Sequence, residues 1–432
     1  MLPPNPSMKI RTVFFSFMRL ATGEVFGRMA TFALFAYISR QFGVEILGIV
    51  ALAQTVASYV MEVSDQGLKL IGARLLARNA ALIGYLVPFV LKRRAALTAI
   101  AVLLGSAYAL FGPIPAGARA CVLVFSLAVI PYAFALDWVA WGLGHFGALA
   151  VWRSGVSILY VALAIVAMRW TMRPIASIAG ANIVSAAGGA VFLGMLWQLR
   201  WRKPANAASP EAVAKAANEL RPSSVFSLGV ANLLNLVFMN ADILLLGAMS
   251  STRQVGRYSS ACKPLYIIFT GFWLLTDALY PHLAKAEGSA RAQRTLLGAL
   301  VLLAVGASAV ALVLGMLAPQ ILTLIYGSTL GAAGLFRVLL IALPIDFCFS
   351  LLWTVLVSRG YQRPVLYSLG VAAAVNVLAN LWFIPRFQAE AAAWATVGSY
   401  VLLFSLLLAY VLRTKIFARA PEGGEVTSAV WA

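Results

Sequence analysis

Residues 295–318 read TLLGALVLLAVGASAVALVLGMLA, a stretch that contains no charged side chain. A helix needs about 20 apolar residues to cross the hydrocarbon core of a bilayer, and this stretch has that length. Of the 432 residues in the chain, 62% are hydrophobic and only 11% are charged. Soluble globular proteins carry about 25% charged residues, so this chain lacks the polar surface to face water. The composition therefore predicts an all-α, polytopic membrane protein.

Similar apolar stretches recur along the chain, separated by charge clusters and by Gly/Pro punctuation. They predict about twelve transmembrane helices, at residues 13–39, 44–66, 95–112, 118–141, 148–168, 175–198, 223–248, 255–281, 295–318, 332–358, 364–385 and 391–412. Between the sixth and seventh, an Ala-rich segment flanked by Pro204 and Pro222 is typical of a linker. We expect an N-terminal six-helix bundle at 1–200, a cytoplasmic linker at 201–222 and a C-terminal six-helix bundle at 223–432 that ends in a short cytoplasmic tail.

The two halves share a pattern at the start of their second helices. Gly48 and Gly256 each follow a polar loop and open a helix dotted with small and polar residues, at an offset of 208 residues. Gly155 and Gly370 lie at a similar offset, 215 residues. Two six-helix halves of the same orientation imply a pseudo-twofold axis along the membrane normal.

Basic residues fix the orientation and account for the net charge of +19. On the side of the N-terminus the predicted loops carry 21 Lys and Arg, against five on the other side: Arg40, Arg169, Arg173, Arg253 and Arg386. Because cytoplasmic loops are enriched in Lys and Arg, both termini are expected in the cytoplasm. The same positive surface is attracted to anionic membrane lipids, so nucleic acid is not needed as a partner.

Four predicted helices carry polar side chains on one face, at about 100° per residue. These faces are Glu24, Arg28 and Thr31; Gln54, Ser58, Glu62 and Asp65; Ser224, Asn232, Asn235 and Asp242; and Ser259, Lys263, Tyr266, Thr270 and Asp277. An ionisable group in a bilayer is costly unless it faces a cavity or a partner, so the four faces predict a central hydrated cavity. The alternative is that these charges neutralise one another as structural pairs, as Glu24 and Arg28 could at i and i+4.

The sequence offers little for catalysis or for a bound cofactor. Cys121, Cys262 and Cys348 are far apart in apolar runs, and His145 and His282 are isolated, so neither a metal nor a disulfide is indicated. The chain contains no G-x-x-x-x-G-K-[ST] motif for ATP. We therefore expect neither an enzyme nor a cofactor-dependent protein.

Several short motifs occur in an order that a known family shares. In the first half these are Gly27-Arg28, Gly43-Val44-Glu45-Ile46-Leu47-Gly48, Asp65-Gln66-Gly67-Leu68, and Leu136-Asp137-Trp138 followed by Gly142. In the second half they are Asn240-Ala241-Asp242-Ile243-Leu244-Leu245-Leu246-Gly247, Val255-Gly256-Arg257-Tyr258, Tyr280-Pro281-His282-Leu283-Ala284, and Asn376, Asn380 and Ile384-Pro385 followed by Ala391-Ala392-Ala393. Over nearly its whole length the chain resembles the O-antigen and exopolysaccharide flippases of the multidrug/oligosaccharidyl-lipid/polysaccharide exporter superfamily. It departs from them at Phe387-Gln388-Ala389-Glu390, where the family usually has a Gly-containing turn.

The resemblance implies two six-helix bundles around a central cavity that opens alternately to either side. It implies that polyprenyl-diphosphate-linked oligosaccharide is moved from the cytoplasmic to the periplasmic leaflet of the bacterial inner membrane, for lipopolysaccharide or exopolysaccharide biosynthesis. It further implies coupling to an H⁺ or Na⁺ gradient, and polysaccharide polymerase or export proteins as partners.

In such a flippase, individual residues of the polar faces would take separate roles. The cations Arg28 and Lys263 would engage the diphosphate, Arg through its planar fork. The sugar would be hydrogen-bonded by Gln54, Asn232, Asn235 and Tyr266. The candidate cation carriers are the carboxylates Glu24, Asp242 and Asp277.

Two other functions stay open at this stage. One is a drug/cation antiporter of the same superfamily, which an acidic cavity without Arg28 and Lys263 would have favoured. The other is a membrane glycosyltransferase or ligase, which the absence of nucleotide-sugar motifs and of long outer loops disfavours.

Overall fold

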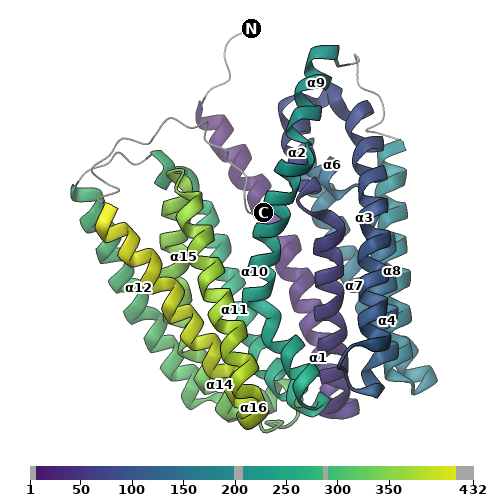
Figure 1. The fold of residues 1–432 in the computed structure, drawn as a ribbon, viewed down its shortest axis with the longest axis vertical. Coiled ribbons are helices and arrows are strands. Elements are labelled where there is room, and N and C mark those ends of the chain that lie inside the picture. The colour runs from purple at the N-terminus through teal and green to yellow at the C-terminus, as the bar shows by residue number, and fades with distance from the viewer. Residues whose placement is uncertain (1–5, 199–207, 286–289, 415–432) are drawn as a thin grey trace. The chain divides into compact units, whose positions relative to one another are not determined.

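The computed structural model describes the backbone of residues 6–198, 208–285 and 290–414. Within these ranges the chain is helical, as expected, and its helices are labelled in Figure 1. Their bounds are α1 Pro6–Asp65, α2 Leu68–Arg78, η1 Ala80–Leu82, α3 Ile83–Phe111, α4 Ala116–Leu127, α5 Val129–Ala133, α6 Asp137–Gly142, α7 Phe146–Thr171, α8 Pro174–Leu196, α9 Pro210–Glu219, α10 Pro222–Met249, α11 Thr252–Lys285, α12 Ala290–Met316, α13 Ala318–Tyr326, α14 Ala333–Leu340, α15 Ala342–Ser358 and α16 Gln362–Thr414.

Nine helical stretches of the described chain are long and apolar enough to cross a membrane. Two of them bend within their length, α1 at Gly43 (φ 82°, ψ 178°) and α16 at Gln388 (φ 52°, ψ −127°). Each bend divides one long helix into two, and α11, with 34 residues, is also long enough to cross. The structure thus agrees with the predicted fold class, an all-α membrane protein of about twelve transmembrane helices.

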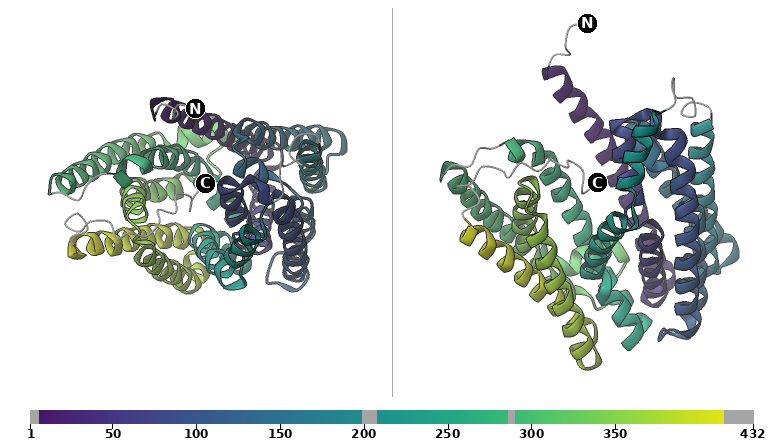
Figure 2. Two further views of the ribbon diagram at one scale, coloured as in Figure 1. Left: turned by 90° about the horizontal axis from the view of Figure 1, so that it is seen from above. Right: turned by 45° about the horizontal axis from the view of Figure 1, so that its top comes forward.

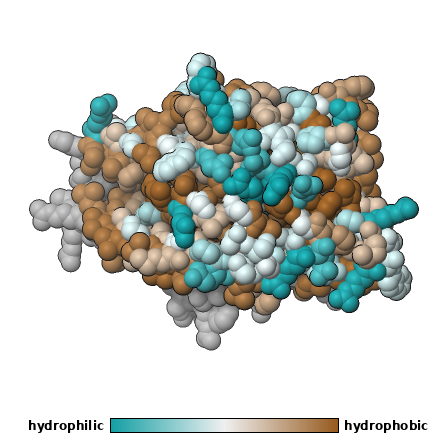
Figure 3. Space-filling view, turned by 90° about the horizontal axis from the view of Figure 1, so that it is seen from below, coloured by the Kyte–Doolittle hydropathy of each residue, from teal (hydrophilic) through white to brown (hydrophobic). Residues whose placement is uncertain are grey.

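The chain forms two compact units that do not follow chain order. Unit 1 consists of Met1–Phe35, Ala53–Gly112 and Ala116–Leu233, and unit 2 of Ala36–Leu52, Pro113–Pro115 and Leu234–Ala432. Within each unit, bundled helices are visible in the turned views of Figure 2. On the end face drawn in Figure 3, hydrophilic side chains gather in patches among hydrophobic ones.

Unit 1 buries a short amphipathic helix, α2, against the rest of its core. The Trp138 side chain on α6 is fully buried in this core. Gly72 of α2 lies directly against the Trp138 ring, where an added Cβ would come within 2.8 Å of it. Glycine at this position therefore allows α2 to pack closely on α6.

Unit 2 joins residues 36–52, the end of the first transmembrane helix and the start of the second, to α11. The two glycines that share a pattern in the sequence, Gly48 and Gly256, lie in contact here. A Cβ on Gly48 would collide with the Thr252 carbonyl oxygen, and one on Gly256 with the Val44 carbonyl oxygen. Such a close backbone approach between helices is what small residues permit in membrane proteins.

Candidate transport site

Asp242 on α10 is buried within unit 2, with 4% of its surface exposed. The hydroxyl of Tyr258, on α11, donates a hydrogen bond to Asp242 Oδ2. From α16, the Thr396 hydroxyl donates to the same oxygen at 3.3 Å and lies 3.0 Å from the Tyr258 hydroxyl. The backbone N–H of Ile243 donates to Oδ1 at 2.8 Å. Neutral donors from three helices therefore converge on one carboxylate.

Other polar side chains of unit 2 lie on α10, which carries this carboxylate, and on α11. Tyr266 donates its hydroxyl to the Met239 carbonyl at 2.9 Å, one turn before Asp242. Lys263 and Asn235 are partly exposed, on α11 and α10 respectively. Four of the residues predicted from sequence, namely Asn235, Asp242, Lys263 and Tyr266, thus lie on α10 and α11 of one unit.

Unit 1 holds three more of the predicted site residues. Arg28 on α1 is exposed, whereas Gln54 and Asn232 are partly exposed. The Gln54 side chain lies beside the Tyr160 hydroxyl, and the Asn232 side chain lies beside the Glu62 carboxyl. The side chains of Glu24 and Asp277, two of the predicted cation carriers, lie outside the described residues.

A second group of buried and partly buried charges lies in unit 1, where an arginine and a lysine are paired with two aspartates. Arg94 on α3 has 1% of its surface exposed, and its Nε lies 3.3 Å from Asp65 Oδ1. Its terminal nitrogens donate to the carbonyls of Ala135 at 3.2 Å and Tyr132 at 3.0 Å. Lys69 Nζ lies 3.1 Å from Asp137 Oδ2. We call Asp65, Lys69, Arg94 and Asp137 the ionic cluster.

At Asp137 of the ionic cluster, burial and the charges of basic neighbours act in opposite directions on the carboxyl pKa. It begins α6, after the transmembrane stretch Ala116–Ala133. Burial alone would raise the pKa of its carboxyl, but the charges of Lys69 and Arg94 outweigh burial and hold the pKa below its usual value. This aspartate is therefore kept ionised by its basic neighbours.

The sequence analysis did not include Tyr258 and Thr396 among the site residues. They belong to α11 and α16 and meet Asp242 across 16 and 154 residues of chain. Tyr258 does stand in the motif Val255-Gly256-Arg257-Tyr258, which is one signal that could have selected it. Thr396 is an ordinary hydroxyl in an apolar helix, and the sequence around it gives no comparable signal.

Residues 16–287, more than half of the chain, match the model of a family described as polysaccharide biosynthesis protein. The chain belongs to this family. As a member of the polysaccharide biosynthesis protein family it is a multi-pass membrane protein. No curated protein matches it.

Solved structures share the fold of this family member at low sequence identity. The lipid II flippase MurJ, in an inward closed conformation, matches with a TM-score of 0.60 and 13% identity, over 92% of this chain and 89% of MurJ. The MATE multidrug transporter DinF-BH matches with a TM-score of 0.61 and 13% identity, over 95% of this chain and 97% of the transporter. The eukaryotic MATE transporter AtDTX14 matches with a TM-score of 0.56 and 13% identity, over 95% and 96%. At this level of identity the three show a common fold.

Proposed function

We propose that the protein is a flippase that moves polyprenyl-diphosphate-linked oligosaccharide from the cytoplasmic to the periplasmic leaflet of the bacterial inner membrane, by alternating access. The family match carries the proposal, since it assigns the chain to polysaccharide biosynthesis. The MurJ-like fold supports translocation of a lipid-linked saccharide over its synthesis. The excess of basic residues in the predicted inner loops supports cytoplasmic termini. Polysaccharide polymerase or export proteins are the partners that such a flippase would serve.

For the substrate, we assign the diphosphate to Arg28 and Lys263 and the sugar to Gln54, Asn232, Asn235 and Tyr266. A diphosphate cannot cross hydrocarbon unaided, so its route needs cations and water. Arg28 is exposed and the other five side chains are partly exposed, which leaves each of them accessible for contact. Amides and a phenol donate and accept hydrogen bonds, as sugar hydroxyls require.

For energy coupling, we assign the H⁺ or Na⁺ site to Asp242, with Glu24 and Asp277 as further carriers. A carboxylate buried in a transmembrane helix is costly unless it carries a proton or binds a cation. In the described part of unit 2, two hydroxyls and a backbone N–H donate hydrogen bonds to Asp242, and none of these donors removes its negative charge. These contacts support a carboxylate whose charge is compensated by a transported cation.

The coupling assignment is tested with Asp242→Asn in proteoliposomes that contain a polyprenyl-diphosphate oligosaccharide. The amide keeps size and hydrogen-bonding capacity but removes the titratable charge. We expect substrate binding to persist, whereas flipping driven by an imposed H⁺ or Na⁺ gradient falls at least about tenfold, to the level without a gradient. Glu45→Gln, which neutralises an exposed carboxylate of unit 2, is the matched control. A normal gradient response in Asp242→Asn would eliminate the coupling role.

The substrate assignment is tested with Arg28→Ala and Lys263→Ala, by surface-glycan display and membrane abundance in cells. Each change removes a charge-assisted contact worth about 1.5–3 kcal/mol, which corresponds to roughly 10- to 150-fold weaker binding. We expect display to be lost at unchanged abundance, and Arg28→Lys to retain part of it, since charge survives without the planar fork. Arg169→Ala, which removes an exposed arginine of unit 1, should leave display intact. Normal display in both test variants would show that these cations do not bind substrate.

A drug/cation antiporter is the second candidate function, because the fold is also that of the MATE multidrug transporter DinF-BH. The same vesicles separate the two functions when a cationic dye replaces the lipid-linked oligosaccharide. Dye efflux without lipid movement would favour the antiporter. Lipid movement without dye efflux would favour the flippase.

A further inference from the structure

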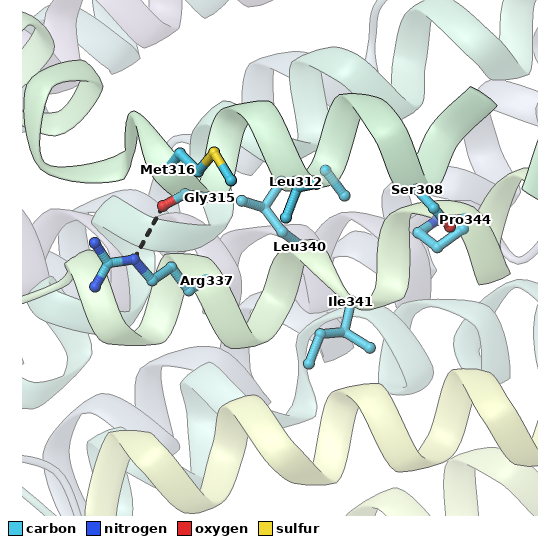
Figure 4. Close-up of a pocket in the computed structure, with 9 residues that line it drawn as sticks. Ser308, Leu312, Gly315, Met316, Arg337, Leu340, Ile341 and Pro344 are labelled. Carbon is cyan, nitrogen blue, oxygen red and sulfur yellow. Dashed lines mark hydrogen bonds between the residues drawn. The ribbon is translucent and has the colours of Figure 1, made fainter. Parts of the chain in front are cut away.

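A cavity of about 590 Å³ lies in unit 2, between α12 on one side and α14 with the start of α15 on the other. Figure 4 shows its lining, which runs from Met316 and Arg337 at one end to Ser308 and Pro344 at the other. Cavities that hold small-molecule ligands measure about 300–1,000 Å³, so this one has a suitable size. We call it the α12–α14 groove.

The sequence explains why the groove stays open. On α12, the lining residues Ser308, Ala311 and Gly315 follow one another at i, i+3 and i+7, so a strip of small side chains faces the groove. On the opposite wall, Pro344 has no N–H to donate to the carbonyl of Leu340, and the helix is interrupted between α14 and α15 at Ile341. Small residues on one wall and a missing helical hydrogen bond on the other accompany a hollow that side chains do not fill.

Apart from the Ser308 hydroxyl at one end, the groove is apolar up to a guanidinium at the other end. Arg337 Nε donates to the Gly315 carbonyl at 2.9 Å, and its terminal nitrogens point away from that carbonyl (Figure 4). Gly315 is the penultimate residue of α12, and Arg337 lies near the start of the membrane-crossing stretch Ala333–Ser358. Both are thus near the ends of membrane-crossing stretches, at the depth where lipid headgroups begin.

The side chains around the groove are apolar and exposed, as those that contact lipid tails are. Leu312 and Met316 on α12 are 60% and 66% exposed, and Ile341 on the opposite wall is 45% exposed. In a membrane-crossing stretch, exposed apolar side chains contact lipid tails. From Arg337 to Pro344 a helix rises about 10 Å, which is most of one leaflet's share of the ~30 Å hydrocarbon core.

We propose that the α12–α14 groove is a binding site for an anionic phospholipid, with one acyl chain in the groove and the lipid phosphate on Arg337. The apolar walls match an acyl tail, and the guanidinium at headgroup depth matches a phosphate, which it binds through its fork of N–H donors. This site belongs to unit 2 alone, so it stands whether or not the transported substrate is a lipid-linked oligosaccharide.

The proposal is tested by photo-crosslinking the detergent-solubilised full chain with phosphatidylglycerol that carries a diazirine in one acyl chain. Labelled peptides are mapped by mass spectrometry, and phosphatidylcholine with the same diazirine chain serves as the neutral probe. We expect label on the peptides that contain residues 308–316 and 337–344, and more from phosphatidylglycerol than from phosphatidylcholine. Equal labelling by the two probes would overturn the assignment of the headgroup to Arg337.

Two variants fill the groove at different points. Gly315→Leu places a side chain against Leu340, since an added Cβ there already lies 3.8 Å from that residue, and Ser308→Leu narrows the far end. We expect each to reduce labelling of both peptides about tenfold. Gly306→Leu is the matched control, because an added Cβ at this position on α12 meets nothing within 4 Å. Undiminished labelling in both filled variants that elute as monodisperse protein would overturn the groove as the site.

The headgroup is tested separately with Arg337→Gln. We expect labelling by phosphatidylglycerol to fall about tenfold, to the level of phosphatidylcholine, because one charge-assisted contact is lost. Arg169→Gln, an exposed arginine on unit 1, should leave the preference unchanged. A preference for phosphatidylglycerol that persists in Arg337→Gln would place the anion elsewhere.

Discussion

Units 1 and 2 both bury carboxylates, but they surround them with different chemistry. In the ionic cluster of unit 1, Asp65 and Asp137 lie against Arg94 and Lys69, so opposite charges are matched inside the protein. In unit 2, Asp242 is held by the hydroxyls of Tyr258 and Thr396. Removing one partner of a buried ion pair leaves an uncompensated charge, whereas removing a neutral donor leaves only a weaker hydrogen-bond set.

This difference bears on an ambiguity that the sequence leaves open, namely whether charges in and next to transmembrane stretches pair structurally or serve transport. The ionic cluster has the contacts expected of structural pairing. Asp242 has the contacts expected of a group that exchanges a cation, as we propose. If the comparison holds, neutralising changes in the two places should differ in their effect on the stability of the folded protein.

The largest effect is expected for Arg94→Leu. It removes the ion pair with Asp65 and two hydrogen bonds to carbonyls, and it takes one of the two basic neighbours away from a largely buried carboxylate. We expect a loss of about 3–5 kcal/mol in the free energy of unfolding. Membrane abundance and thermal unfolding, followed by fluorescence-detected gel filtration, measure this loss.

The double variant Arg94→Leu/Asp65→Asn serves as the rescue, because it removes both charges together. It should recover part of the lost stability. Arg93→Leu, next to it, loses one hydrogen bond to the Leu220 carbonyl and should cost less than Arg94→Leu. Equal losses in Arg93→Leu and Arg94→Leu would show that the ionic cluster has no special structural role.

An intermediate effect is expected for Tyr258→Phe. This change deletes a hydroxyl that donates to Asp242 and lies near Thr396, while the ring still fills its buried place. Hydrogen bonds to charged groups contribute about 1.5–3 kcal/mol, which is the expected decrease in stability. Thermal unfolding at equal detergent and lipid content measures it, and an unchanged melting temperature would contradict the hydrogen-bonded arrangement around Asp242.

The smallest effect on stability is expected for Asp242→Asn. The single amide oxygen keeps the Tyr258 and Thr396 hydroxyls at the Oδ2 position but loses the Ile243 N–H, while the charge that burial disfavours is gone, so the two effects offset and the change should stay within about 1 kcal/mol. The melting temperature of the purified variant provides the measurement. A loss as large as that of Arg94→Leu would instead identify Asp242 as part of a structural pair, and the proposed coupling role would fail with it.

Much of the fold can be predicted from sequence, because the length of an apolar stretch and the charged, Gly and Pro residues that bound it are local properties of the chain. The predicted helix boundaries at 39 and 44 enclose Gly43, where α1 bends, and those at 385 and 391 enclose Gln388, where α16 bends. Gln388 has a positive φ of 52°, a conformation that glycine adopts more easily, and this is the place where the resembling family usually has a glycine turn.

Other features depend on contacts between distant residues and could not be predicted. Segment Leu68–Arg78 lies in a predicted loop, yet it forms α2 because Gly72 lets it pack on Trp138. The hydroxyls around Asp242 come from separate helices, and helical periodicity on α10 says nothing about which side chains α16 brings to it. The sequence can therefore indicate a polar residue on a face, but not the partners that determine its chemistry.

The contact between Gly48 and Gly256 limits which residues can occupy these two positions of unit 2. Each added methyl group would meet a backbone carbonyl of the other segment, and a carbonyl within a helix cannot turn aside as a side chain can. Alanine, elsewhere the mildest replacement, is therefore excluded at both positions. Along α12, by contrast, Gly298 and Gly306 have open space where a side chain would project. Substitutions are therefore expected to be tolerated at Gly298 and Gly306 on α12. Neither Gly48 nor Gly256 can be replaced unless the two backbones first move apart.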